Sequence, residues 1–340
     1  MNRIILIVVI ALFTFSQVGN SQERIGKELN TLFEYLYSME ETPIIKIDTD
    51  TKKLVRDKRK EEYQPSVVSI KMADGEIVDW PSKIRARGNI RKEVCYFPPL
   101  KLNFKEKQLK ENNFDSLDIL KMVIQCRIGD NTAKYTRKER LAYHLYEQID
   151  SLHFKTKNVF VHLYKDGELK EELVGFLIES EDHYAARMNC QIIEKGTLRS
   201  GILAREHFLK MGFFQYMIAN PDYAIPNKHN VELLQLPSKK FVAVPYDFDY
   251  SGIVNTDYAT PHESLGIKNV TDRIFLHKNV SFEEAKVTAQ YYLSKEQEFY
   301  DLIANADYLL DSDRKTTTKF IEAFFRTLKA DGRIRRAFVR

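Results

Sequence analysis

The pattern of apolar residues changes near residue 180, and this change constrains the fold more than any other feature of the sequence. Between residues 43 and 180, short apolar runs of strand type alternate with turn signals such as Asp74-Gly75 and Asp166-Gly167. After residue 180 the spacing is mostly helical, apart from one hairpin. The sequence therefore predicts an α+β protein, with a sheet-rich part over residues 22–180 and a helical part over residues 181–340.

Helix signals are clear at three places. The segment Tyr135–Asp150 is amphipathic and forms the one prominent helix expected within the largely antiparallel sheet-rich part. A second helix, Ala204–Ala219, ends before Pro221, as the restricted backbone of a pre-proline residue predicts. Ser281 and Glu284 form a capping box that begins a helix running to about residue 305.

The first 21 residues have the pattern of a signal peptide. Met1-Asn2-Arg3 is short and basic, Ile4–Phe15 is apolar, and Ser16–Ser21 is polar and rich in small residues. The apolar run is shorter than the roughly 20 residues of a membrane span, so an uncleaved anchor is the less favoured alternative. We expect cleavage after Ser21, export to the periplasm or the extracellular space, and no membrane span in the mature chain.

The composition is that of a folded protein with a sizeable core, because 44% of the 340 residues are hydrophobic and 12% are aromatic. A formal net charge of +4 gives no case for a nucleic-acid partner. The three cysteines, Cys95, Cys126 and Cys190, form neither a disulfide framework nor a metal-type Cys-x-x-Cys pair. One bridge, such as Cys95 to Cys126, and three buried thiols both fit this set.

A hairpin with acidic residues at its base is expected within Asn220–Gly252. Two apolar runs flank a Pro-Ser-Lys-Lys turn and predict a hairpin with a four-residue loop, in which Leu236 faces Phe241. This register places Asn230 directly opposite Asp247, with Cβ atoms about 5 Å apart.

The loop before the hairpin adds a further acid, Asp222. An amide and a carboxylate beside a loop acid suit a hard cation next to a proton acceptor. Asn227 is the alternative ligand, because it stands five residues after Asp222, the spacing of a kinase catalytic loop. The hairpin register favours Asn230. We interpret His229 and His262 as hydrogen-bonding or surface residues, because magnesium prefers oxygen ligands.

A sheet-rich part with one helix, followed by a helical part that opens with an acid-bearing loop and a hairpin, is the layout of protein-kinase-like folds. The sequence thus predicts a bilobal kinase-like fold with an antiparallel-sheet N-lobe. Such enzymes need a strand lysine and a helix glutamate that holds it. Lys101 alternates with apolar neighbours on a predicted strand, and Glu139 lies on the predicted helix. An exposed strand lysine and a solvent-facing glutamate are the alternative interpretations.

Two further groups complete the candidate site. Arg85, Arg87, Gly88, Asn89 and Arg91 form a basic loop between two predicted strands, and their guanidinium groups suit phosphate. Glu179 ends a strand where the two parts join, and is either an inter-lobe hinge residue or a surface acid.

At these residues the chain resembles the spore-coat protein H (CotH) kinase family, an atypical protein-kinase-like group, and most closely an uncharacterised exported branch of it. The matching segments, spread over roughly residues 84–252, are IRARGN followed by PPLKLNF, YTRKERLAYHLYEQI, LVGFLIESED, MIANPDYAIPNKHNV and VPYDFDYSG. The resemblance implies a bilobal fold that binds ATP with Mg²⁺ and transfers phosphate to a protein acceptor.

The resemblance also implies roles for individual residues. Lys101 would contact phosphates, Glu139 would pair with Lys101, and Glu179 would lie at the hinge. Asp222 would be the catalytic aspartate, Asn230 and Asp247 would bind the metal, and Asp249 would support or join them. With Arg87 and Gly88 as phosphate contacts, these residues form the predicted site.

Two other functions fit the sequence as well. The segment Tyr223–Lys228 lengthens the loop between the acid and the asparagine of the family pattern, and PYDFDYSG replaces a tryptophan-containing segment. An inactive kinase-like module for cell-surface binding or scaffolding is therefore one alternative. A metal-dependent hydrolase that uses Asp247, Asp249, His229 and His262 is the other.

Overall fold

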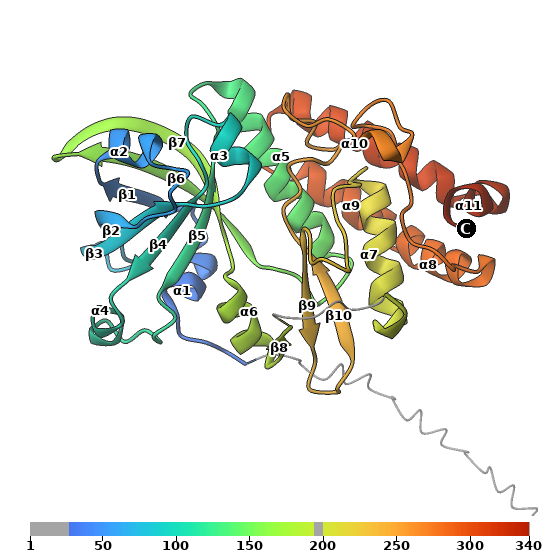
Figure 1. Cartoon of the computed structure of the whole chain (residues 1–340), viewed down its shortest axis with the longest axis horizontal. Coiled ribbons are helices and arrows are strands. Elements are labelled where there is room, and N and C mark those ends of the chain that lie inside the picture. The colour runs from blue at the N-terminus through green and yellow to red at the C-terminus, as the bar shows by residue number, and fades with distance from the viewer. Residues whose placement is uncertain (1–26, 194–199, 340) are drawn as a thin grey trace, which may run out of the picture.

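The computed structural model describes residues 27–193 and 200–339, so the expected signal peptide lies outside the described residues. Seven strands form a closed barrel in the order β1-β2-β3-β4-β5-β7-β6 (Figure 1). They are β1 (Ile44–Asp48), β2 (Gln64–Lys71), β3 (Ile77–Ala86), β4 (Leu100–Phe104), β5 (Ile119–Ile124), β6 (Thr156–Lys165) and β7 (Glu168–Ile178).

The barrel contradicts the predicted bilobal kinase-like fold with an antiparallel-sheet N-lobe. Strand β1 pairs with β6 in parallel, with Ile44 beside Phe160, and this pairing joins the two edges of the sheet. All other neighbouring strands of the barrel are antiparallel. The closing pair comes from strands far apart in the sequence, and no local spacing of apolar residues indicates it.

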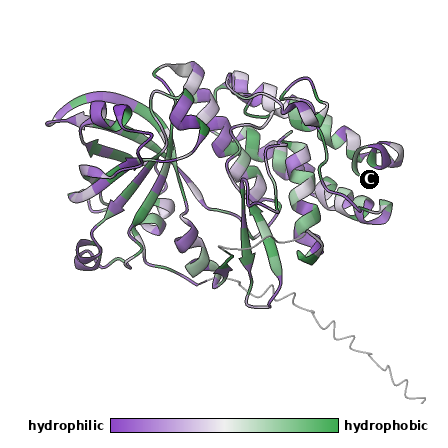
Figure 2. Ribbon diagram, in the orientation of Figure 1, coloured by the Kyte–Doolittle hydropathy of each residue, from purple (hydrophilic) through white to green (hydrophobic). Residues whose placement is uncertain are grey.

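The barrel interior is filled by alternate residues of each strand, because successive side chains of a strand point to opposite faces. Ile45, Ile47, Trp80, Leu100 and Leu102 belong to this interior core. Four short helices lie around the barrel: α1 (Leu32–Ser38), α2 (Thr51–Arg56), α3 (Ile90–Val94) and α4 (Glu106–Glu111). Figure 2 shows hydrophilic colour on α2 and α4, which lie at the outer edge of the barrel. The segment after β3, which the sequence predicts to be a basic loop, contains the helix α3, and Arg91 lies on this helix.

The rest of the described chain is mainly helical. Its helices are α5 (Asp130–Glu147), α6 (Glu181–Met188), α7 (Arg205–Met217), α8 (Phe282–Ser294), α9 (Glu296–Ala304), α10 (Asp311–Leu328) and α11 (Asp331–Phe338). Two 3-10 turns, Ser200–Ile202 and Glu263–Leu265, lie between them. The capping box of Ser281 and Glu284 is confirmed at the start of α8. The single helix predicted to follow it is divided at Lys295 into α8 and α9.

The predicted hairpin is present, but its register differs by one residue. Strands β9 (Val231–Gln235) and β10 (Phe241–Pro245) pair Gln235, not Leu236, with Phe241, and β8 (Gln191–Ile192) joins the other edge of β9. Lys239 adopts a left-handed backbone with φ of 64°, and the Leu236 N–H donates to the Lys240 carbonyl. The loop therefore has three residues instead of four. Asn230 consequently lies opposite Tyr246, and Asp247 follows one position later.

The barrel and the helical part share one core. Val123, Phe176 and Ile178 point outward from the barrel and are buried in the same cluster as residues of α5, α7 and the β9–β10 hairpin. This cluster contains residues from both sides of position 180. The division of the chain at that position stays a prediction. None of the described helices combines the length and the apolar composition that a membrane span requires.

A disulfide joins Cys95, at the end of α3, to Cys126, just after β5, while Cys190 is a free, partly exposed thiol. Of the two alternatives for the cysteines, the single bridge is the one present. The bridge anchors α3 beside the end of β5, at the edge of the cleft described next.

Candidate active site

A narrow cleft of about 60 Å³ lies between the barrel and the base of the β9–β10 hairpin, with residues of α3 and α5 in its wall. It brings together seven residues that the sequence predicts for the site: Arg87, Gly88, Glu139, Asp222, Asn230, Asp247 and Asp249. The other two, Lys101 and Glu179, do not line it. The alternative ligand Asn227 is exposed and lies outside the cleft wall.

Three carboxylates gather around one arginine in this cleft. The Arg91 Nε donates to Asp249 Oδ2 at 2.8 Å, and its Nη2 donates to Glu139 Oε2. Asp247 Oδ1 lies 3.8 Å from the same Nη2. Arg91 and Glu139 are buried, with side chains 10% and 2% exposed. The Tyr258 hydroxyl completes the group by donating to Asp249 Oδ2 at 2.9 Å.

The acids of this cluster differ in their protonation. Desolvation and the charge of Asp249 raise the pKa of Asp247 to about 7, although Arg91 and Arg87 oppose the shift. Burial raises the pKa of Glu139 to about 8, also against Arg91. Burial alone would raise the pKa of Asp249 too, but Arg91 and Tyr258 lower it. Asp247 and Asp249 repel each other as like charges, and the guanidinium of Arg91 beside both of them offsets only part of this repulsion, since the pKa of Asp247 stays raised.

The backbone directs Asp247 toward the cleft. Its φ of 59° is left-handed, and its N–H donates to the Tyr143 hydroxyl of α5 at 2.8 Å. The side chain stays 42% exposed, where a ligand can reach it. Glu139 Oε1, in contrast, is buried and has no hydrogen-bond partner among the described residues. An unpaired buried carboxylate oxygen is costly unless a proton or a cation occupies that position.

The loop after α7 holds a second polar group. Asp222 Oδ1 lies 2.8 Å from His229 Nε2, and Asp222 Oδ2 accepts a hydrogen bond from Asn230 Nδ2 at 3.0 Å. Asn230 has a left-handed φ of 52°, and its Nδ2 also donates to the Asp222 carbonyl at 2.7 Å. Both donor contacts of Asn230 use the amide nitrogen, which leaves its amide oxygen for a ligand.

The lysine–glutamate pair expected from the sequence does not form, since Glu139 pairs with Arg91. Lys101 points outward from β4, as its alternation with Leu100 and Leu102 predicts. It lies between Arg85 of β3 and Lys121 of β5 in the strand register. Three like charges side by side on one sheet face are unfavourable without anions.

Acids of the protein balance only the two outer cations of this row. Arg85 pairs with Glu61, and Lys121 pairs with Glu181 of α6. Lys101, in the middle, has no ion-pair partner among the described residues, and neither does Arg87. Burial and the charges of Arg87 and Lys101 lower the pKa of Lys121, so these cations act on one another across the barrel face. Of these two unpaired cations, Arg87 lines the cleft beside the acidic cluster, whereas Lys101 lies on the barrel face outside the cleft wall.

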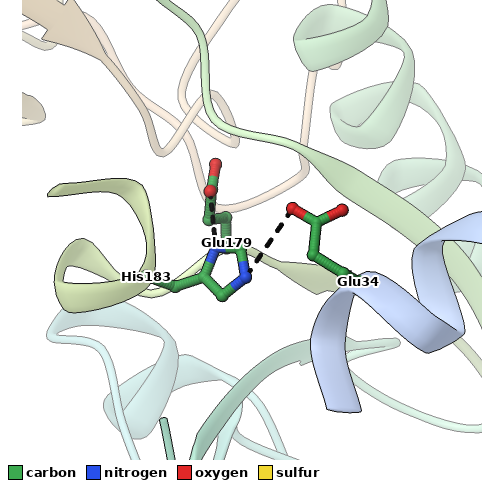
Figure 3. A group of neighbouring side chains, drawn as sticks. All are labelled: Glu34, Glu179 and His183. Carbon is green, nitrogen blue, oxygen red and sulfur yellow. Dashed lines mark hydrogen bonds and ion pairs between the residues drawn. The ribbon is translucent and has the colours of Figure 1, made fainter. Parts of the chain in front are cut away.

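Glu179 lies in a separate buried network at the start of α6. Its Oε1 accepts hydrogen bonds from His183 and Arg187, and its Oε2 accepts from Arg187 and the Lys155 N–H. Figure 3 shows the His183 imidazole between Glu179 and Glu34. Within residues 27–193 and 200–339, these three side chains are the only group of histidines, cysteines and acids with all ligand atoms within 4.8 Å.

A metal does not suit this network. Both oxygens of Glu179 already accept two hydrogen bonds each, Arg187 contributes a fixed positive charge, and the Thr31 hydroxyl contacts His183 Nε2. Glu34 is held by the Lys155 ammonium at 2.8 Å. Glu179 is therefore a structural residue that ties β7 to α6, and it does not face the cleft.

A neighbouring groove of about 520 Å³ shares Asp222 and Tyr250 with the cleft and continues along Pro221, Pro261 and Leu265. His262 lines this groove and accepts a hydrogen bond from the Ser264 N–H. His262 therefore lines a different hollow from Asp247 and Asp249. This arrangement does not favour the hydrolase alternative, in which His262 and the two acids would bind one metal.

Sequence reasoning missed two features of the site. Arg91 was counted among basic residues of a loop, whereas it lies on α3 and contacts the acids of the cluster. The contact between His229 and Asp222 was also unforeseen, although a histidine seven positions after a loop acid was a visible signal. No family model and no curated protein matches the sequence.

Proposed function

We propose that the cleft binds Mg²⁺ with ATP and transfers a phosphoryl group to a protein acceptor. The observation that carries this proposal is that Asp247 and Asp249 line the cleft together, both beside Arg91, so that a bound cation would offset the remaining repulsion between the two acids. Mg²⁺ is usually held by one or two carboxylates together with substrate phosphates and water, so two acids are sufficient. The unpaired Oε1 of Glu139 and the amide oxygen of Asn230 would be further oxygen ligands for this cation.

The cations of the barrel support the second half of the proposal. Arg87 lines the cleft and Lys101 lies on the adjoining barrel face, and neither has an ion-pair partner among the described residues. Guanidinium and ammonium groups of this kind bind phosphate. Gly88 helps the chain approach a ligand, because its φ of 83° is left-handed.

Each of these residues would have a distinct role in phosphoryl transfer. Asp247 and Asp249, with Asn230, would hold the cation, which supplies charge neutralisation for the phosphates when bound. Arg87 and Lys101 would offset the remaining phosphate charge. Asp222 would orient the acceptor hydroxyl, and the groove beside it offers room for the acceptor chain. The contribution of the protein would be mainly positioning and electrostatic stabilisation.

Export to the periplasm or the extracellular space is part of the same proposal. The Cys95–Cys126 disulfide supports it, since such bridges persist in oxidising compartments. The resemblance to the CotH family also stays a prediction, and it rests on the site residues and not on the fold.

Thermal unfolding with ATP, in the presence and absence of Mg²⁺, tests the proposal. A hundredfold excess of ligand over its dissociation constant should stabilise the wild type by about 2.7 kcal/mol, and only with Mg²⁺. Asp247→Asn should abolish this stabilisation, because the isosteric amide cannot neutralise the cation. The exposed Asp307→Asn is the matched control and should respond as the wild type does.

Two results would contradict the proposal. An Asp247→Asn protein that gains as much stability from Mg-ATP as the wild type would remove the metal assignment. A wild type that is not stabilised by any nucleotide would favour the inactive binding or scaffold module.

A further inference from the structure

We infer that His229 is a further catalytic residue, which takes the proton of the acceptor hydroxyl while Asp222 holds its imidazole. The inference rests on the proposed phosphoryl transfer and assigns the proton acceptor within that site. It starts from the contact of 2.8 Å between His229 Nε2 and Asp222 Oδ1.

This contact defines the proton positions on the imidazole. An ionised carboxylate only accepts hydrogen bonds, so His229 Nε2 carries the hydrogen and Nδ1 keeps its lone pair. Nδ1 has no hydrogen-bond partner in the described part of the chain. The side chain is 47% exposed and lines the cleft with Asp247 and Arg87. Nδ1 is therefore unpaired among the described residues, on a half-exposed side chain in the wall of the cleft.

The surrounding loop holds the pair in place from both sides. The N–H groups of Ala224 and His229 each donate to the carbonyl of the other at 2.9 Å, which fixes the backbone of His229. The carboxylate of Asp222 is fixed by Asn230 through Oδ2. The N–H of Asp222 donates to Asn220 Oδ1 at 3.1 Å.

Asn220 is itself anchored to α7. It is 1% exposed, and its Nδ2 donates to Oε1 of the equally buried Gln215 at 2.9 Å. A chain of buried amides thus connects the helix to Asp222 and then to the imidazole. Such a supported pair resembles the histidine and aspartate of hydrolytic triads in its division of roles, in which the carboxylate orients the imidazole and stabilises the imidazolium.

Asp222 is less suited to take the proton itself. Both of its carboxylate oxygens already accept a hydrogen bond from the protein, one from His229 and one from Asn230. The imidazole Nδ1 has no such contact. Asp222 is therefore the positioning residue of the pair and His229 the group that meets the acceptor.

The transfer step balances with these groups alone. The O–H bond of the acceptor breaks and its proton goes to His229 Nδ1, while the acceptor oxygen forms a bond to the γ-phosphorus. The bond between this phosphorus and the bridging oxygen breaks, and its electron pair leaves with the nucleoside diphosphate. The imidazolium, stabilised by Asp222, then returns its proton to water or to the departing nucleoside diphosphate.

The test compares His229→Gln, His229→Ala and the control His162→Gln in phosphate transfer from ATP to dephosphorylated casein. The histidine of the control lies on β6 and lines neither the cleft nor the neighbouring groove. We expect His229→Gln to lower kcat by about 10²- to 10³-fold, the usual contribution of a positioned base, with little change of KM for ATP. Added imidazole should restore part of the kcat of His229→Ala, and His162→Gln should keep the wild-type rate.

The outcomes separate this inference from the proposed function. If the wild type transfers phosphate and His229→Gln keeps its kcat, His229 has no catalytic role and Asp222 acts alone. If His229→Ala is inactive, is not rescued by imidazole and has also lost stabilisation by Mg-ATP, the role of His229 is structural and the inference is overturned. A wild type that transfers no phosphate overturns the proposed function and the inference with it.

Discussion

A single buried histidine shows how strongly the interior of this protein selects protonation states. His277 is 4% exposed, and its ring stacks on Phe208 with centroids 3.8 Å apart. Neither ring nitrogen has a hydrogen-bond partner among the described residues. Burial, with a smaller contribution from the charge of Arg205, lowers the pKa of His277 to about 3. The imidazole is therefore neutral in the folded protein near neutral pH.

We expect His277→Phe to raise the free energy of unfolding, because the phenyl ring keeps the stack on Phe208 and removes unpaired polar atoms. This gain in the free energy of unfolding, relative to the wild type, should increase as the pH falls. The folded pKa of about 3 lies below the ordinary value of 6.5, so the wild type loses stability as the pH falls from 6.5 toward 3. At about pH 5 this linkage amounts to roughly 2 kcal/mol. Denaturant titrations at neutral pH and at about pH 5 measure both effects.

The half-buried His162 on β6 offers the control for this exchange, as His162→Phe. A stability difference between His277→Phe and wild type that is the same at both pH values would contradict the linkage. Destabilisation at both pH values would instead show that the phenyl ring does not fit beside Gly212, which the His277 ring already contacts closely.

Residue type and local spacing were sufficient for most of the candidate site. Asp222, Asn230 and Asp247 were predictable because acids and amides stood in a turn-rich segment around a hairpin. The role of Arg91 was not predictable, because it depends on α3, a helix of five residues without a side-chain cap. Since Arg91 reaches Glu139 from this helix, the expected partnership of Glu139 with Lys101 fails.

At the level of elements, the Glu179 network joins the end of β7 to α6 and the N-terminal segment. Burial alone would raise the pKa of Glu179, but the hydrogen bonds and charges of Arg187 and His183 lower it to about 2. The folded pKa lies below the ordinary value of 4.5, so the stabilisation is complete above pH 4.5. It is lost as the pH falls from 4.5 toward 2.

We expect Glu179→Gln to lower the free energy of unfolding at neutral pH by about 3–5 kcal/mol, because Arg187 would remain buried without a counter-charge. The variant should also lose less stability than the wild type between pH 4.5 and 2. Thermal unfolding across this pH range measures both effects. Glu172→Gln on the same strand, where the side chain is 65% exposed, is the matched control and should change stability little.

Thermal unfolding in the presence of a chelator tests whether the Glu179 network binds a metal ion. A chelator should leave the unfolding temperature of the wild type unchanged, because hydrogen-bond donors already occupy both oxygens of Glu179. A drop in the unfolding temperature with chelator, absent in Glu179→Gln, would contradict this interpretation and indicate a bound ion.

For the β9–β10 hairpin, the sequence predicts the two strands but not their register. Both strands were located from their apolar runs, but the register depended on the conformation of Lys239, which adopts the left-handed region without being glycine or asparagine. One residue of loop length moves Asn230 from Asp247 to Tyr246. Asn230 nevertheless reaches Asp222, because its own left-handed backbone turns the amide toward the preceding loop.

On the scale of the whole molecule, the closed barrel was the feature that the sequence did not reveal. The individual strands follow the period of two that their interior residues require, and several were recognisable from it. Closure depends on the parallel pairing of β1 with β6, a contact between distant parts of the chain. Alternation within a strand is the same in an open and a closed sheet, so the local pattern favoured an open antiparallel sheet.

Packing between the barrel and the helices has a consequence for unfolding. Phe176 leaves the barrel on β7 and contacts Tyr143 of α5, with ring centroids 5.7 Å apart. It belongs to the core that also holds α7 and the hairpin. If the barrel separated, this outer apolar face would be exposed to water, which costs free energy in proportion to its area.

We therefore expect the described chain to unfold in one cooperative transition. Trp80, the only tryptophan of the sequence, is buried inside the barrel, so its fluorescence reports on that part alone. Far-ultraviolet circular dichroism reports mainly on the helices. The two signals should change at the same denaturant concentration, which is the test of two-state behaviour.

Phe176→Ala should lower both midpoints together, by an amount equivalent to about 3–5 kcal/mol for a buried phenylalanine, because its side chain belongs to the shared core. Leu169→Ala, at an exposed position on the same strand, controls for substitution in β7. Separate midpoints in the wild type, or a shift of the dichroism signal alone in Phe176→Ala, would show that the two parts unfold independently. That result would favour the boundary at residue 180, whereas a single shared midpoint would mean that the cleft and its walls form and disappear together.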